Sequence, residues 1–188
     1  MRAFALTAEC GPRFDVRHWG TTPAEERLAF PCDGLLPGAH DAAYRAVTVD
    51  APAPVLFRWL CQLRVAPYSY DWIDNLGRPS PRHLIPGLDD LAVGQRVMCL
   101  FELVEFERDV HLTARSRPSR SFGSFAATYR IVPLGDRRCR LVVKLLMAYP
   151  RPVLLARALG ELVLLGDWVM MRKQLLTLKR LAEETERR

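Results

Sequence analysis

The aspartate at position 167 points most directly to chemistry, because it interrupts a helical face that is otherwise apolar. When a helix advances by about 100° per residue, one face gathers Asp167, Gln174 and a set of apolar or small residues. That set is Ala156, Gly160, Val163, Leu164, Met170, Met171, Leu178 and Leu181. A carboxylate on such a face must be paired, hydrated or shifted in pKa. Facing a cavity, Asp167 is a candidate catalytic acid or base, or an acceptor for a ligand hydroxyl. The alternative is a structural ion pair with an arginine, or a hydrogen bond to the segment 68–75.

A second group of candidates is crowded into eight residues and consists of Tyr68, Tyr70, Trp72 and Asn75. Aromatic rings with a hydroxyl or amide beside them suit the mouth of a pocket, where the polar groups orient a ligand. We therefore predict that these four residues bind a ligand, together with Val163, Met170, Met171 and Gln174 of the helical face. The alternative is a packed aromatic plug in which Asp71 acts as a capping residue.

Polar residues also interrupt the apolar alternation of the predicted strands, at Glu102, Arg115, Tyr129 and Lys144. Arg115 and Tyr129 are candidate ligand-binding residues if their side chains point into a cavity. The alternative is that such residues lie on the solvated convex face of the sheet. A single β-bulge inverts which side chains face inward, so both interpretations stay open.

Several classes of site are not indicated by the sequence. The histidines at 18, 40, 83 and 111 lack metal-ligand spacing, and the five cysteines contain no C-x-x-C pair. Nucleotide-binding glycine loops and the G-x-S-x-G motif are also missing. We therefore predict no metal and no cofactor, and expect Cys61, Cys99 and Cys139 to be buried, reduced thiols.

Composition narrows the possible partners. The chain has 188 residues, is 49% hydrophobic and carries a formal charge of +6. Its basic residues are mostly arginines and are scattered, so we expect no nucleic-acid partner. No stretch reaches the ~18 apolar residues that a membrane-spanning helix needs, and the N-terminal apolar run is too short for a signal peptide. The expected location is the cytoplasm.

The predicted elements describe an α+β domain at residues 44–188, preceded by an arm at 1–43. Thr22-Pro23-Ala24-Glu25 predicts a short helix over 23–29. A strand over 44–49 and a helix opened by Pro52 and Pro54 follow. Closely spaced strands are expected at 97–107, 110–117, 122–132 and 138–149, as an antiparallel meander. One long helix closes the chain over 150–188.

The first half of that last helix is apolar on its far side as well. Leu154, Ala158, Leu162, Leu165 and Val169 form this second stripe. A helix that is apolar all round must be covered on both sides. The N-terminal arm is the favoured cover, and a second subunit or a membrane surface are the alternatives.

Several stretches resemble the START-like polyketide cyclase/dehydrase superfamily, often labelled SRPBCC. They are residues 44–52 (YRAVTVDAP), 59–63 (WLCQL), 68–79 (YSYDWIDNLGRP), 91–94 (LAVG) and 167–175 (DWVMMRKQL). Residues 19–25 (WGTTPAE) resemble the arm of one uncharacterised branch. Arg64-Val65-Ala66-Pro67 stands where the family has a glycine-rich run, so a different pocket mouth is expected.

The resemblance implies a helix-grip fold, in which a curved antiparallel sheet wraps a long C-terminal helix around an apolar cavity. It does not imply one activity. The first hypothesis is a protein that binds a small hydrophobic ligand, lipid-like, polyketide-like or aromatic. The second is a cyclase or dehydratase in which Asp167 moves protons and Tyr68, Tyr70 or Arg115 stabilises an enolate. The third is a homodimer formed through Leu154, Ala158, Leu162 and Leu165.

Overall fold

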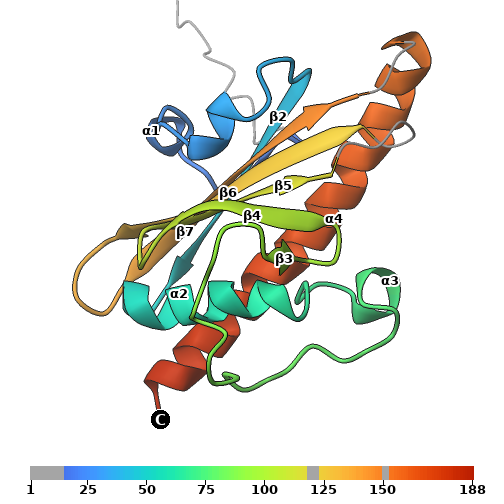
Figure 1. The fold of residues 1–188 in the computed structure, drawn as a ribbon. Coiled ribbons are helices and arrows are strands. Elements are labelled where there is room, and N and C mark those ends of the chain that lie inside the picture. The colour runs from blue at the N-terminus through green and yellow to red at the C-terminus, as the bar shows by residue number, and fades with distance from the viewer. Residues whose placement is uncertain (1–14, 118–122, 150–152) are drawn as a thin grey trace, which may run out of the picture.

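The computed structural model describes residues 15–117, 123–149 and 153–188, and for 153–159 the backbone only. A curved sheet wraps around one long helix, as the helix-grip expectation requires (Figure 1). The sheet has seven strands in the order β1-β2-β7-β6-β5-β4-β3, all antiparallel except the pair β1–β2. The strands are β1 His18–Trp19, β2 Asp41–Val49, β3 Arg96–Val97, β4 Phe101–Glu107, β5 His111–Ser116, β6 Ser124–Pro133 and β7 Cys139–Ala148. The helices are α1 Pro23–Glu26, η1 Pro31–Gly34, α2 Ala53–Cys61, η2 Gln62–Arg64, α3 Asp71–Asp74 and α4 Val153–Glu186.

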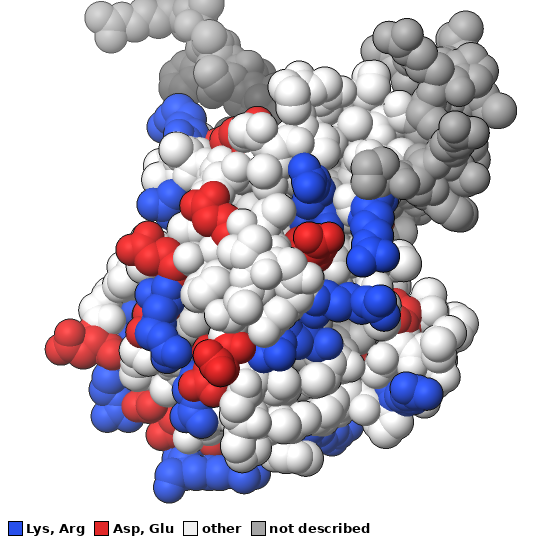
Figure 2. All heavy atoms as spheres, in the orientation of Figure 1, with Lys and Arg blue, Asp and Glu red and all other residues white. Residues whose placement is uncertain are grey.

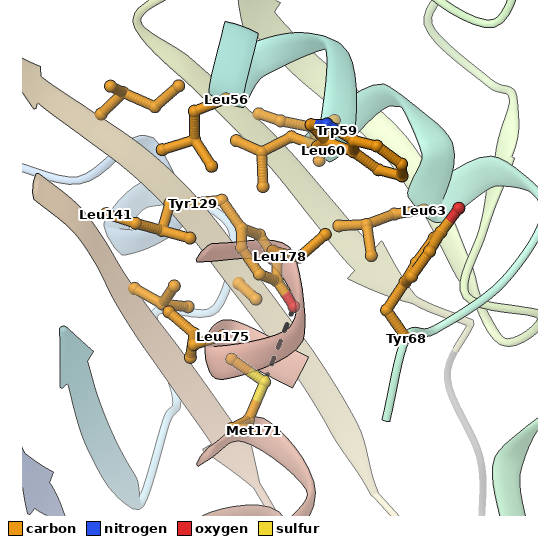
Figure 3. Close-up of a cluster of buried hydrophobic side chains, with 14 of the residues drawn as sticks. Leu56, Trp59, Leu60, Leu63, Tyr68, Tyr129, Leu141, Met171, Leu175 and Leu178 are labelled. Atoms are coloured by element: carbon orange, nitrogen blue, oxygen red, sulfur yellow. Dashed lines mark hydrogen bonds between the residues drawn. The ribbon is translucent and has the colours of Figure 1, made fainter. Parts of the chain in front are cut away.

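The core lies between the concave face of the sheet, α2 and the second half of α4 (Figure 3). Helix α2 begins directly after Pro52 and carries Pro54 in its first turn, where a proline is tolerated. Its apolar face then meets that of α4, and the Trp59 indole donates a hydrogen bond to the Thr185 hydroxyl at 3.0 Å. The central contacts are made by Leu56, Trp59, Leu60, Leu63, Tyr129, Leu141, Leu175 and Leu178.

The inward face predicted for α4 is confirmed where side chains are described. Its buried members are Gly160, Leu164, Met171, Gln174, Leu178 and Leu181. Leu175 and Ala182 are buried as well, because both β2 and α2 pack against α4. The predicted boundaries differ by a few residues elsewhere: β2 begins at Asp41 rather than Tyr44, and α1 ends at Glu26.

On the far side of α4 the apolar side chains are exposed: Leu162 by 66%, Leu165 by 43% and Val169 by 40%. The side chains of Leu154 and Ala158 and all of residues 1–14 lie outside the described part of the chain. The favoured cover, the arm, therefore stays a prediction for this stripe. Among the described residues, no helix is long and apolar enough to cross a membrane.

Residues 15–40 pack onto the sheet. The capping box predicted at Thr22 and Glu25 is confirmed, and β1 pairs in parallel with β2. Phe30 and Cys32 are buried against the convex face, where the Cys32 amide donates to the Thr128 hydroxyl at 3.1 Å. These residues thus cover part of the convex face, over β2, β6 and β7. The division into an arm at 1–43 and a domain at 44–188 remains a prediction.

The single strand expected over 97–107 is wrong, because the chain turns between β3 and β4. Met98 and Cys99 have φ values of 46° and 60°, in the left-handed region. The Met98 amide donates to the Leu63 carbonyl at 2.8 Å, and the Leu100 amide to the Met98 carbonyl at 2.6 Å. No glycine or proline stands at 98–100 to announce this turn. It leaves Cys99 exposed, so the expectation of a buried thiol fails there.

A test of the arm's attachment is Gly20→Ala, since Gly20 has a φ of +72° and an added Cβ would lie 2.2 Å from the Ala46 carbonyl oxygen. We expect a loss on the order of 2 kcal/mol in the free energy of unfolding, measured by urea titration. The matched control is Gly34→Ala, which meets nothing within 4 Å and should change stability by less than about 0.5 kcal/mol. Equal stability of the two variants would contradict a tight contact between arm and sheet.

Candidate functional site

A cavity of about 800 Å³ lies between the concave sheet and the first half of α4. Its inner wall is buried and mostly apolar, and its outer rim is exposed and carries charges. Buried lining residues are Pro67, Ser116, Gly123, Ala127, Tyr129, Leu145, Met171 and Gln174. Exposed ones are Gly94, Arg96, Cys99, Leu100 and Arg117. The size falls within the roughly 300–1,000 Å³ typical of small-molecule sites.

At the inner end of the cavity, Tyr129 and Gln174 form a closed polar pair. The Tyr129 hydroxyl donates to Gln174 Oε1 at 2.7 Å, and Gln174 Nε2 donates to the Pro67 carbonyl at 2.6 Å. Burial raises the pKa of Tyr129, so its hydroxyl stays neutral at physiological pH. Its proton is therefore committed to Gln174, while its oxygen can still accept a hydrogen bond from a ligand.

Asp167 lies in the cavity wall and forms a buried ion pair. Its Oδ2 accepts from Nη2 of Arg45 at 2.9 Å, and the Arg45 side chain is fully buried. The same guanidinium donates to the carbonyls of Val16, Arg17 and Tyr44. The structural alternative raised for Asp167 is thus present, but Asp167 also lines the cavity.

Loss of hydration on burial is the largest cause of the pKa shifts of both Asp167 and Arg45. Burial raises the pKa of Asp167 to about 6, although the nearby charge and hydrogen bond of Arg45 favour the ionised form. Burial also lowers the pKa of Arg45, but a guanidinium stays charged in proteins. Asp167 can therefore exist in both protonation states near neutral pH, which an acid–base group requires.

Six of the predicted site residues line the cavity: Tyr129, Val163, Asp167, Met170, Met171 and Gln174. Five do not: Tyr68, Tyr70, Trp72, Asn75 and Arg115. Arg115 is exposed because it alternates along β5 with Ser116, whose side chain does line the cavity. Of the other two polar strand residues, Glu102 lines the cavity, whereas Lys144 pairs with Asp33 on the convex side.

The aromatic segment contributes different residues from those predicted. Tyr68 has a φ of 58° and is buried edge-on against Trp59, with ring centroids 6.1 Å apart. Trp72 is 75% exposed, and Asn75 Nδ2 donates to the Arg78 carbonyl at 2.6 Å. The segment instead places Pro67, Ser69 and Asp74 in the lining.

Sequence reasoning missed most of the rim. Met98, Cys99 and Leu100 reach the cavity only because of the left-handed turn between β3 and β4. Arg96 lies in β3, and Arg117 directly follows the end of β5. No cluster of three histidine, cysteine or acidic residues that could hold a metal occurs in the described residues.

No protein-family model and no curated protein matches the sequence. Solved structures do match in fold. The hypothetical protein jhp0584 from Helicobacter pylori aligns with a TM-score of 0.54 at 14% identity, over 82% of this chain and 95% of its own. The di-domain ARO/CYC BexL from the BE-7585A biosynthetic pathway aligns with a TM-score of 0.51 at 13% identity.

The chain spans less than half of BexL, covering 47% of that protein with 77% of its own length. Identities this low show a shared fold. The α+β helix-grip architecture is therefore established for this chain.

The buried ion pair can be tested with a double-mutant cycle of Arg45→Met and Asp167→Leu. Each single change leaves one charge buried without its partner and should cost about 3 kcal/mol in the free energy of unfolding. The double variant should lose much less than the sum, because neither charge remains. Chemical denaturation of all four proteins gives the coupling energy. Additive losses would mean that the two groups do not stabilise each other.

The raised pKa of Asp167 also predicts a pH dependence of stability. Between pH 3.8, the ordinary pKa of an aspartate, and about 6, the folded state holds the proton more tightly than the unfolded chain. The contribution of Asp167 to stability is therefore greatest at low pH and falls as the pH rises through 6, by up to about 3 kcal/mol.

The measurement is the difference in unfolding free energy between the parent and Asp167→Asn, taken across this pH range. Hydrogen bonding to Arg140 lowers the pKa of Glu25, which gives a slope of opposite sign that cancels in the difference. A flat difference curve would contradict the shift.

Proposed function

We propose that this chain binds a small hydrophobic molecule in the cavity between the sheet and α4. The observation that carries the proposal is the cavity itself. Protein interiors are packed about as densely as organic crystals and contain few voids larger than a water molecule. A space of about 800 Å³ with a mostly apolar lining therefore favours a bound hydrophobic molecule.

The lining explains how such a ligand would be held. Removing apolar surface from water contributes about 25 cal/mol per Å², which supplies the main driving force. Met98, Met170 and Met171 line the cavity with flexible, polarizable side chains that adapt to different shapes. Asp167 and the Tyr129 oxygen offer acceptors that would fix the orientation of a ligand hydroxyl.

A cyclase or dehydratase is the second candidate, favoured by one observation: Asp167 lines the cavity and has a pKa raised to about 6. The name of BexL, an ARO/CYC from a biosynthetic pathway, is in keeping with this candidate. Three residues considered for stabilising an enolate, Tyr68, Tyr70 and Arg115, are not in the lining. Binding is therefore the better supported function.

The proposal is tested by filling the cavity with Ala127→Leu, since Ala127 is buried and lines it. Native mass spectrometry of freshly purified parent protein should show an added mass that leaves on denaturation. Ala127→Leu should reduce occupancy at least tenfold, on the order of the 1.4 kcal/mol that corresponds to that factor, with no loss of thermal stability. Leu134→Ala, on the exposed turn between β6 and β7, is the control and should retain the ligand.

Equal occupancy in parent and Ala127→Leu would contradict binding in this cavity. The enzymatic candidate is separated by incubating the protein with a linear poly-β-keto thioester mimic. Recovery of the unchanged mimic in complex supports binding, whereas loss of water and ring closure, abolished in Asp167→Asn, supports catalysis.

A further inference from the structure

The mouth of the cavity is surrounded by large apolar side chains that the fold leaves in solvent. On α3 and the residues after it, Trp72 is 75% exposed, Ile73 51% and Leu76 89%. Leu100, which lines the mouth, is 74% exposed. The first half of α4, whose Val163 and Met170 line the same cavity, leaves Leu162, Leu165 and Val169 exposed on its far side. Most of the large hydrophobic residues that are exposed in the described part of the chain thus lie on elements that border the cavity mouth.

Contacts tie these elements to each other. The Ser69 hydroxyl donates to the Met170 carbonyl at 3.1 Å, so α3 begins beside the middle of α4. Ser69, Asp74 and Leu100 all line the cavity, which places α3 and the β3–β4 turn at the same mouth. Trp72, Ile73, Leu76 and Leu100 therefore belong to one end of the molecule rather than to scattered sites, which would need no explanation.

The conformation of Leu76 shows that folding does not account for its presence. It has a φ of 53°, in a region that glycine and asparagine occupy more readily than leucine, and it is the most exposed of these residues. A leucine at this position adds backbone strain and buries almost nothing. The Leu76 side chain would therefore contribute a favourable free energy only when a partner outside the chain buries it.

The charge around the mouth indicates the kind of partner. Arg78 and Arg82 follow α3, and Arg96 and Arg117 line the mouth; all four are exposed. None forms an ion pair with another described residue, and the carboxylates on the same bordering elements, Asp71, Asp74 and Glu102, are half-buried rather than exposed. On the side where Figure 1 places α3, Figure 2 shows mostly uncoloured side chains, with more blue than red ones beside them.

We infer that this end of the molecule, defined by Trp72, Ile73, Leu76 and Leu100 with the four arginines, docks on an anionic membrane surface. Tryptophan and arginine favour the boundary between lipid headgroups and acyl chains, where apolar groups insert and cations meet phosphates. A second copy would bring the same unpaired arginines face to face, in a chain with a net charge of +6. The cavity mouth would then open onto the bilayer, from which a hydrophobic ligand can enter without crossing water. This source of ligand rests on the proposed function, while the docking itself does not.

Sedimentation with vesicles tests the docking. The full chain should bind vesicles of phosphatidylcholine with phosphatidylglycerol, bind pure phosphatidylcholine weakly, and detach as salt is raised. Trp72→Ala should weaken binding about tenfold, since the loss of a buried aromatic side chain costs at least that factor. Arg78→Gln with Arg82→Gln should weaken it roughly fivefold for each charge.

Leu76→Asn is the sharpest variant, because asparagine suits the left-handed conformation. It should keep or raise the melting temperature while weakening vesicle binding severalfold, so misfolding cannot explain the loss. Leu134→Ala, 53% exposed at the far end of β6 from the cavity, should bind vesicles like the parent.

Failure of each proposal is distinguishable, because cavity occupancy is measured by native mass spectrometry without vesicles. The docking inference is overturned if no vesicle composition binds, if Leu134→Ala weakens binding as much as Trp72→Ala, or if Trp72 and Leu76 instead mediate a concentration-dependent dimer in light scattering. A protein that binds vesicles while its cavity is empty would support docking and contradict the proposed ligand-binding function.

Discussion

The fully buried guanidinium of Arg45 is the group on which much of this structure depends. A charge without water must be surrounded by acceptors, and Arg45 finds them on three different elements. It reaches the carbonyls before β1, its own strand β2, and Asp167 on α4. The arm, the sheet and the closing helix are therefore held in register at one point. A core of leucines would pack as densely there but would not specify this geometry.

The position of α2 explains why a cavity exists at all. This helix packs across the concave sheet and meets only the second half of α4, where Leu175 and Leu178 are buried. Beyond its reach the sheet still curves around α4 (Figure 1), and in the described part of the chain no further helix packs between the two. The cavity begins at that point, between Met171 and Val163, and Asp167 lies in its wall. Packing elsewhere thus determines where a ligand could enter.

Periodicity made the elements predictable, whereas side-chain direction was predictable only on the helix. The inward face of α4 followed from its apolar stripe and its opposing charges, and so did the placement of Asp167, Met171 and Gln174. Strands are less informative, because each residue faces one of two sides and any irregularity exchanges them. Arg115 and Tyr129 looked equivalent in the sequence, yet only Tyr129 lines the cavity. The left-handed turn at Met98 and Cys99 carries no glycine, so no sequence signal announced it.

The polar groups within the cavity also restrict what the proposed ligand would be. The charge of Asp167 is balanced by Arg45, and the Tyr129 proton is given to Gln174. These groups are therefore close to neutral together and offer oxygen acceptors rather than free donors. A ligand carrying a buried charge would find no counter-charge there, and burying a lone charge is far more costly than burying a hydroxyl that donates a hydrogen bond. A neutral hydroxyl on an apolar skeleton meets both requirements, with any acidic group left at the rim beside Arg96 and Arg117.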